Sequence, residues 1–121
     1  MREPARKFQD LIVGQKAHKF VLEVYRETKN FPHFEIYGLT NQLRRSSVSI
    51  PANMAEGFVK RSNVEKGRFF NISQGSLEET RYYLILANDL GYCDTRHLLA
   101  QIEEISKLLE SFCKSLSRTN S

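Results

Sequence analysis

Tryptophan is absent from this sequence, and its 121 residues include only two cysteines, three prolines and six glycines. The cysteines, Cys93 and Cys113, form no CxxC group, so the sequence predicts neither a disulfide framework nor a zinc site, and no metal is expected. This use of cysteine fits a reducing compartment. So few prolines and glycines argue against a loop-rich all-β chain and favour long helices.

Long hydrophobic runs are missing as well. The longest strongly apolar run, Leu84 to Ala87, is far too short to cross a bilayer. The segment from Met1 to Lys7 has no apolar region of the kind found in signal peptides. We therefore expect a cytoplasmic protein with no membrane partner.

Catalytic and cofactor-binding arrangements are also lacking. The three histidines, His18, His33 and His97, lie in different segments, and no paired Glu-x-x-His motifs of the di-iron type occur. Ser76 follows Gly75 but lies outside a GxSxG motif, and the glycines form no phosphate-binding loop. The sequence thus predicts a protein that is not an enzyme, with no catalytic residues and no cofactor.

What the sequence does contain is apolar residues at helical spacing. Stripes with intervals of three and four positions predict helices over residues 10–30, 40–60, 63–90 and 95–117. A chain of this length makes one domain, residues 1–121. Four helices joined by short connections predict an all-α fold, an antiparallel up-down-up-down four-helix bundle.

Helix ends can be placed from capping signals. Ser62 to Glu65 has the form of a capping box, so the third helix is expected to begin at Asn63. Gly91 is the expected residue just beyond its end. Asp94 or Thr95 is expected to cap the fourth helix.

Two residues interrupt the predicted helices. Pro51 lacks the amide hydrogen that would bond to the carbonyl of Ser47, so we predict that the second helix is kinked at Pro51. Gly14, inside the first helix, either costs about 1 kcal/mol relative to alanine or lets another backbone pack closely. The sequence leaves both explanations of Gly14 open.

The third predicted helix carries two adjacent apolar stripes. One contains Phe70, Ser73, Leu77, Thr80, Leu84 and Ala87, and the other contains Phe69, Ile72, Ser76, Tyr83, Leu86 and Leu90. A helix that packs on one side needs a single stripe, so two stripes indicate burial by the bundle and by another copy of the chain. We predict an oligomer interface at Phe69, Ile72, Tyr83 and Leu86. The alternative is a helix at the centre of the monomer's own core.

The formal net charge of +4 is confined to one segment. Residues 42–70 contain six basic and two acidic residues, whereas the rest of the chain is balanced. The segment is either a solvated helix end beside a connection or a binding patch. The candidate nucleic-acid-binding residues are Arg44, Arg45, Lys60, Arg61, Lys66 and Arg68.

Several blocks of the sequence resemble a known family. The longest, from Tyr37 to Phe58, reads YGLTNQLRRSSVSIPANMAEGF. Shorter blocks are GSLEE and ANDLGY in the third helix, and FQDL and QKA in the first. Together they are similar to the 23S rRNA intervening sequence proteins, a family of four-helix bundles. One departure is Gly14, where the family commonly has tryptophan.

The resemblance implies a bacterial protein whose characteristic assembly is a toroidal homopentamer, and some relatives are encoded inside insertions in ribosomal RNA genes. The accessory protein of diversity-generating retroelements is also similar, and it is associated with nucleic acid and a reverse transcriptase. The implied partners are therefore further copies of the chain, RNA or DNA, and a reverse transcriptase or another protein. No enzymatic activity and no catalytic residue are implied.

Two functions follow from these expectations. In the first, a homo-oligomer gathers the segment from Arg44 to Arg68 into a charged surface that binds RNA or DNA through phosphates, with Phe58, if exposed, stacking on an unpaired base. In the second, the protein is a protein–protein interaction scaffold with no nucleic-acid binding. Its arginines then form structural ion pairs with Glu56, Glu78 or Glu79.

Overall fold

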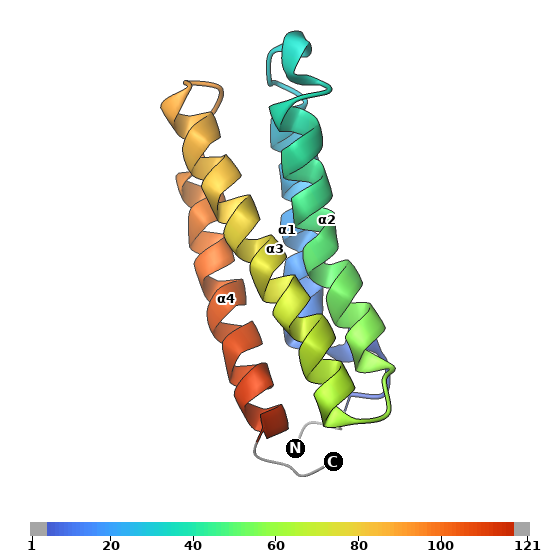
Figure 1. Ribbon diagram of the computed structural model, residues 1–121. Helices are drawn as coiled ribbons and strands as arrows, with labels where there is room; N and C mark the ends of the chain where they lie inside the picture. Colours follow the sequence, from blue (N-terminus) through green and yellow to red (C-terminus); the bar gives the residue numbers. More distant parts are fainter. Residues whose placement is uncertain (1–4, 118–121) are drawn as a thin grey trace.

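The computed structural model describes residues 5–117, which form four α-helices and two short 3-10 helices (Figure 1). In chain order these are η1 (Phe8–Asp10), α1 (Ile12–Thr28), η2 (His33–Glu35), α2 (Leu39–Phe58), α3 (Asn63–Asp89) and α4 (Arg96–Ser117). No strand occurs in this part of the chain, so the predicted all-α fold with four helices is confirmed. Each α-helix begins and ends within two residues of its predicted limits. The ends of the predicted domain, residues 1–4 and 118–121, lie outside the described residues.

Consecutive helices run in opposite directions. The hydroxyl of Thr80 donates to Ser46 Oγ at 2.8 Å, whereas the hydroxyl of Ser73 donates to the carbonyl of Ile50, also at 2.8 Å. Residue numbers along α3 therefore fall as those along α2 rise, which requires an antiparallel pair. In Figure 1 the direction of the chain reverses again from α3 to α4. Because α4 packs on α1 as well as on α3, the four helices close into a bundle.

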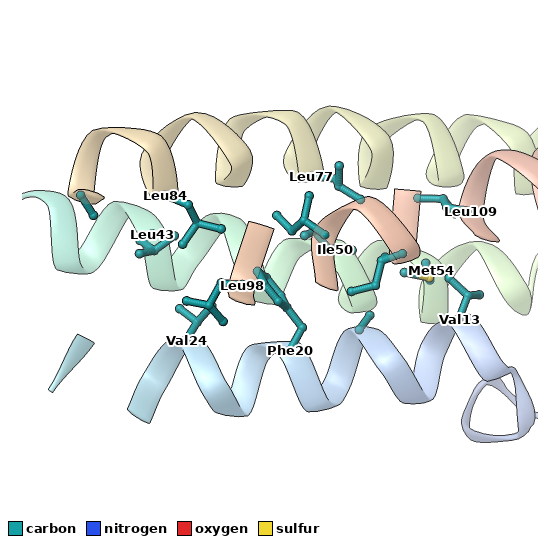
Figure 2. Close-up of a cluster of buried hydrophobic side chains, with 14 of the residues drawn as sticks. Val13, Phe20, Val24, Leu43, Ile50, Met54, Leu77, Leu84, Leu98 and Leu109 are labelled. Carbon is teal, nitrogen blue, oxygen red and sulfur yellow. The ribbon is translucent and has the colours of Figure 1, made fainter. Parts of the chain in front are cut away.

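The helices turn their apolar stripes into one core (Figure 2). The labelled side chains are at most 6% exposed and come from all four helices: Val13, Phe20, Val24, Leu43, Ile50, Met54, Leu77, Leu84, Leu98 and Leu109. Fully burying one side chain of this size contributes about 1.5–3 kcal/mol. Tertiary packing of these stripes, rather than the intrinsic propensity of each segment, therefore provides most of the stability of the helices.

Both ends of α3 follow the predicted capping. At its start, Ser62 Oγ accepts a hydrogen bond from the amide of Glu65 at 3.1 Å. Beyond its end, Gly91 has a φ of 78°, and the amide of Tyr92 donates to the carbonyl of Ala87 at 3.0 Å. This is a Schellman motif, in which glycine adopts the left-handed conformation that other residues avoid. The predicted roles of Ser62 and Gly91 are confirmed.

The start of α4 uses both of its candidate capping residues. Asp94 Oδ1 accepts a hydrogen bond from the amide of Arg96 at 3.0 Å. Thr95 occupies the position before the helix, and its carbonyl accepts from the amide of Leu99 at 2.9 Å. Its buried hydroxyl donates instead to the carbonyl of Leu84 at 2.9 Å. Asp94 thus provides the side-chain cap, and Thr95 ties α4 to α3.

α2 is one continuous helix through Pro51, and the kink at Pro51 stays a prediction. Serine and asparagine side chains surround the proline. The side-chain amide nitrogen Nδ2 of Asn53 donates to the carbonyl of Ser49 at 2.8 Å, and the hydroxyl oxygens of Ser49 and Ser76 are 2.8 Å apart. The first hydrogen bond gives the Ser49 carbonyl a side-chain donor, and the second links α2 to α3.

The two explanations of Gly14 can now be separated. A Cβ at this buried position would lie 2.9 Å from Cε1 of Phe8 and 3.1 Å from the Phe8 carbonyl oxygen. The ring and backbone of Phe8 therefore pack directly on Gly14. Close approach is the correct explanation, because η1 folds back over the start of α1.

Candidate nucleic-acid interface

The six candidate basic residues fall into two groups. Arg44 and Arg45 lie in the second turn of α2, whereas the other four lie at or just after the connection from α2 to α3. At 1.5 Å per residue, the part of α2 between the two groups is about 20 Å long. The structure therefore does not bring all six together in one patch.

Arg44 is half-buried between α2 and α1. Its Nε donates to Oγ1 of the buried Thr28 at 2.8 Å, and its guanidinium carbon lies 4.7 Å from the centre of the Tyr25 ring. Both contacts are with α1, so the Arg44 guanidinium links α2 to α1 through a hydrogen bond and a cation–π interaction. Arg44 thus contacts its own chain, and its role as a nucleic-acid contact stays a prediction.

Arg45, the next residue, is exposed on the other side of α2. With Gln42, Ser46, Ser49 and Glu79 it lines a polar cleft of about 430 Å³ between α2 and α3. Arg45 forms no ion pair with any carboxylate in the described chain. Its charge is therefore available to an external partner.

The remaining four cations and two phenylalanines form what we call the connection cluster. It consists of Phe58, Lys60, Arg61, Lys66, Arg68 and Phe69. Lys66 Nζ donates to the carbonyl of Phe58 at 2.6 Å and lies 5.4 Å from the centre of the Phe58 ring. A cation at this carbonyl satisfies the C-terminal end of α2 and interacts favourably with the helix dipole. Lys66 therefore contacts its own chain, while part of its side chain stays exposed to solvent.

Phe69 organises two further cations of the connection cluster. Lys60 Nζ lies 4.9 Å, and the Arg68 guanidinium carbon 5.9 Å, from the centre of the Phe69 ring. Arg61 and Arg68 are exposed, and Phe58 and Phe69 are half-buried. Because cations already lie over both rings, the cluster offers positive charge rather than open aromatic faces. The geometry does not support the predicted stacking of a base on Phe58.

The candidate basic residues are not paired with nearby glutamates in the described part of the chain. Within residues 5–117, none of the six candidate basic residues forms a salt bridge. Glu78 pairs instead with Arg81, which also reaches Glu103 on α4 at 2.7 Å. The structural role found here for Arg44 is therefore a contact with Thr28 and Tyr25, not an ion pair.

The residues predicted to form an oligomer interface all lie on α3. Ile72 is 46% exposed, whereas Phe69, Tyr83 and Leu86 are half-buried against their own chain. The second stripe is thus only partly covered within the subunit, and its role as an interface stays a prediction.

Sequence reasoning missed two exposed aromatic side chains at the end of the bundle opposite the connection cluster. Phe34 is 78% and Tyr37 93% exposed, and both lie in the connection between α1 and α2. Neither belongs to a helical stripe, so periodicity carries no signal for them. The only available sign was the number of aromatic residues in the connection of residues 29–38, which contains Phe31, Phe34 and Tyr37.

The thiols and histidines form no chemical site in the described part of the chain. No group of three or more His, Cys, Asp or Glu side chains that could hold a metal occurs there. Partial burial raises the pKa of both Cys93 and Cys113, which opposes formation of the reactive thiolate. No helix among residues 5–117 has the length and apolar character needed to cross a membrane.

Comparisons with known proteins agree with the fold. The family model described as 23S rRNA-intervening sequence protein matches residues 9–111. A solved structure from Bacteroides thetaiotaomicron VPI-5482, described as a protein with unknown function from the S23 ribosomal protein family, is 27% identical in sequence. The similarity covers 85% of this chain and 99% of that chain, with a TM-score of 0.77. No curated protein matches the chain.

Proposed function

Because the chain belongs to the family of 23S rRNA-intervening sequence proteins, we propose that it is a non-enzymatic bacterial protein that forms a homo-oligomer in the cytoplasm and binds nucleic acid through the connection cluster. The expected assembly is a pentamer, and the expected ligand is RNA or DNA. The observation that carries the proposal is a group of four cations at one end of the bundle, none of them in a salt bridge within the described residues.

Charge density supports a phosphate ligand. Residues 58–70 contain four basic residues and one acidic residue, Glu65. The contacts with Phe58 and Phe69 restrict Lys60, Lys66 and Arg68, so less conformational freedom is lost when they meet an anion. Arginine can hold a phosphate through two parallel hydrogen bonds, and lysine acts as a point charge. Binding of this kind reads the backbone and shape of a nucleic acid more than its sequence.

An oligomer would strengthen this weak local attraction. Each copy contributes one connection cluster, and linked clusters raise the effective concentration of the second contact once the first has formed. One long structured RNA could then span several copies of the protein. We therefore expect the affinity for nucleic acid to depend on assembly as well as on charge.

Binding at several salt concentrations tests this proposal. Fluorescence anisotropy with a labelled structured RNA and a labelled DNA duplex, between about 50 and 200 mM salt, should show a steep loss of affinity as salt rises. In the Arg61→Glu, Arg68→Glu variant we expect weaker binding and a salt slope smaller by about 2, one unit for each phosphate contact removed.

A variant with the same change in net charge at other sites is the control. Arg26 and Lys107 are exposed and lie on α1 and α4. The Arg26→Glu, Lys107→Glu variant should bind nearly as the unaltered protein does. Absence of binding at low salt, or an equal effect of the two double variants, would refute a specific role for the connection cluster.

A protein-interaction scaffold without nucleic-acid binding is the second candidate function. It is favoured by the exposed side chains of Phe34 and Tyr37, which a partner protein, such as a reverse transcriptase, could cover. Under this alternative, replacing both residues with serine should abolish partner binding and leave the fold intact. The outcome of the salt titration decides between the two candidates.

A further inference from the structure

We propose that copies of this chain associate side by side in one orientation, with an exposed strip on α1 of each copy packed on an exposed strip on α3 of the next. The α1 strip consists of His18, Leu22, Tyr25 and Lys29. The α3 strip consists of Glu78, Tyr82, Ile85 and Asp89. The inference rests on the self-association in the proposed function, and it adds which two surfaces of the subunit meet.

Helical spacing places each strip on one side of its helix. In both strips the residues follow one another at intervals of four, three and four positions, and all of them are exposed. Leu22 is 52%, Tyr82 59% and Ile85 42% exposed. Each strip thus has two large apolar or aromatic side chains at its centre and polar or charged ones at its ends. An apolar centre with a polar rim is typical of interfaces between proteins.

The two strips occupy different sides of the subunit. The α1 strip lies on the side formed by α1 and α2, because the guanidinium carbon of Arg44 is 4.7 Å from the centre of the Tyr25 ring. The α3 strip lies on the side formed by α3 and α4, because Glu78 pairs with Arg81, which also reaches Glu103 on α4. Unlike surfaces therefore meet, and each copy binds two neighbours. Such a contact can close into a ring, as the expected pentamer requires, whereas a surface packed on its own copy would stop at a dimer.

The centres of the strips lie at one level of the bundle. Arg44 of α2 contacts Tyr25, and Gln42, two residues away, accepts a hydrogen bond from the hydroxyl of Tyr83 at 3.5 Å. Tyr25 of α1 and Tyr82 of α3 are therefore at about the same height. Copies in one orientation can bring these two tyrosines together without a large shift along the bundle.

The strips also run in the same direction, because consecutive helices alternate and α1 and α3 are both antiparallel to α2. Lys29 follows Tyr25 toward the same end of the bundle as Asp89 follows Tyr82. Neither Lys29 nor Asp89 forms a salt bridge within residues 5–117. The next copy can therefore supply the opposite charge for each of them.

The charges around the two centres identify the occupant as the other strip of a second copy. The Arg44 guanidinium adds positive charge over Tyr25. In contrast, Glu78 shares Arg81 with Glu103, so these three groups carry one net negative charge beside the α3 strip. A cationic strip against an anionic one favours contact between unlike strips and disfavours contact of either strip with its own copy.

The α3 strip differs from the stripe that the sequence predicts as an oligomer interface. Tyr82 and Ile85 are exposed, whereas Tyr83 and Leu86 are half-buried against their own chain. A neighbouring copy can therefore cover the α3 strip without any rearrangement of the subunit.

One variant in each strip should break the contact. Leu22→Glu and Ile85→Glu place a carboxylate among the apolar side chains that the contact buries, so each should weaken assembly at least tenfold. Light scattering after size-exclusion chromatography at micromolar concentration measures the mass, and the unaltered protein should be an oligomer. Val64→Glu is the matched control and should leave the mass unchanged, because Val64 is a 78% exposed apolar residue of α3 outside the strip. Circular dichroism checks that each variant keeps its helices.

Mixing the two variants tests whether the strips bind each other. The Leu22→Glu variant keeps an intact α3 strip, and the Ile85→Glu variant keeps an intact α1 strip. Sedimentation of an equimolar mixture at high concentration should therefore show a dimer that neither variant forms alone. This dimer should not grow further, because the two strips that remain uncovered are both altered.

The outcomes separate this inference from the proposed function. An oligomer that persists in either single variant, or a mixture without the dimer, overturns the contact between the strips while homo-oligomerisation stands. A monomer in the unaltered protein overturns both statements about assembly, and the salt titration of nucleic-acid binding is then judged on its own.

Discussion

Arg44 and Arg45 have opposite environments although they are identical neighbours. Successive residues of a helix point about 100° apart, because one turn contains 3.6 residues. Arg44 is therefore directed at Thr28 and Tyr25 of α1, and Arg45 lies on the cleft toward α3. At this scale, one guanidinium stabilises the subunit and the other is left for a partner.

Alanine substitution should separate these two roles. Arg44→Ala removes a charged hydrogen bond to the buried Thr28 and a cation–π contact, so we expect the free energy of unfolding to fall by about 1–2 kcal/mol. Arg45→Ala, the matched control, should change it by less than about 0.5 kcal/mol. Urea unfolding followed by circular dichroism measures both. Equal losses in the two variants would contradict the structural role assigned to Arg44.

The difference between the two arginines could not be predicted from the sequence. Counting charges along the sequence identified residues 42–70 as basic. Four of the cations in this segment are exposed or half-exposed and lie near one connection. However, counting charges could not tell Arg44 from Arg45, because that depends on which side of α2 faces α1. Only the packing of α2 between α1 and α3 settles the direction of each side chain.

At the scale of the elements, the start of α2 is held by a carboxylate from outside the helix. The residue before α2 is Gly38, which has no side chain to cap it. Glu35 Oε1 instead accepts a hydrogen bond from the amide of Leu39 at 3.0 Å, and Glu35 Oε2 accepts one from the hydroxyl of Tyr92 at 2.7 Å. Because Tyr92 precedes α4, this carboxylate links two connections at the same end of the bundle.

The Glu35 contacts predict how stability depends on pH. The hydrogen bonds from Leu39 and Tyr92 lower the pKa of Glu35 from its ordinary value of 4.5. The ionised form is thus favoured in the folded state, and its contribution to stability is complete above the unfolded pKa and is lost as pH falls through the folded pKa. Glu35→Gln should be less stable than the unaltered protein at pH 7.

Thermal melts between pH 7 and pH 3 provide the measurement. We expect the melting temperatures of the unaltered protein and the Glu35→Gln variant to converge as the pH falls below about 4.5. Tyr92→Phe, which removes one of the two donors, should give an intermediate difference at pH 7. A difference that stays constant across this range would show that ionisation of Glu35 does not stabilise the helix start.

Most of the elements were predictable, and their exceptions have physical causes. The stripes of α1 and α4 and the caps at Ser62 and Gly91 fixed the limits of the long helices because they depend on local spacing. η1 and η2 are three residues each, too short for periodicity to indicate them. The capping of α2 by Glu35 could not be predicted from the sequence either, since Tyr92, the second hydrogen-bond partner of Glu35, is distant in the sequence.

At the scale of the whole molecule, the two ends of the bundle differ in character. The connection between α2 and α3 carries the connection cluster, whereas the connection between α1 and α2, at the opposite end in Figure 1, carries the exposed Phe34 and Tyr37. An assembly in which copies associate through the sides of their bundles would gather the basic ends without covering them and would leave the aromatic ends for a separate partner.

Chemical modification of lysines should detect this polarity. Lys60 belongs to the connection cluster, and Lys29 lies just after α1, at the other end. When structured RNA is bound at low salt, acetylation of Lys60 should fall several-fold, because its ammonium group contacts phosphate, while acetylation of Lys29 should stay nearly constant. Mass spectrometry of the peptides measures both sites in one sample. Because the same protein supplies the control lysine, unfolding or a general change in reactivity would affect both sites. Equal protection at the two ends would mean that nucleic acid coats the bundle without preference, and the connection cluster would lose its assigned role.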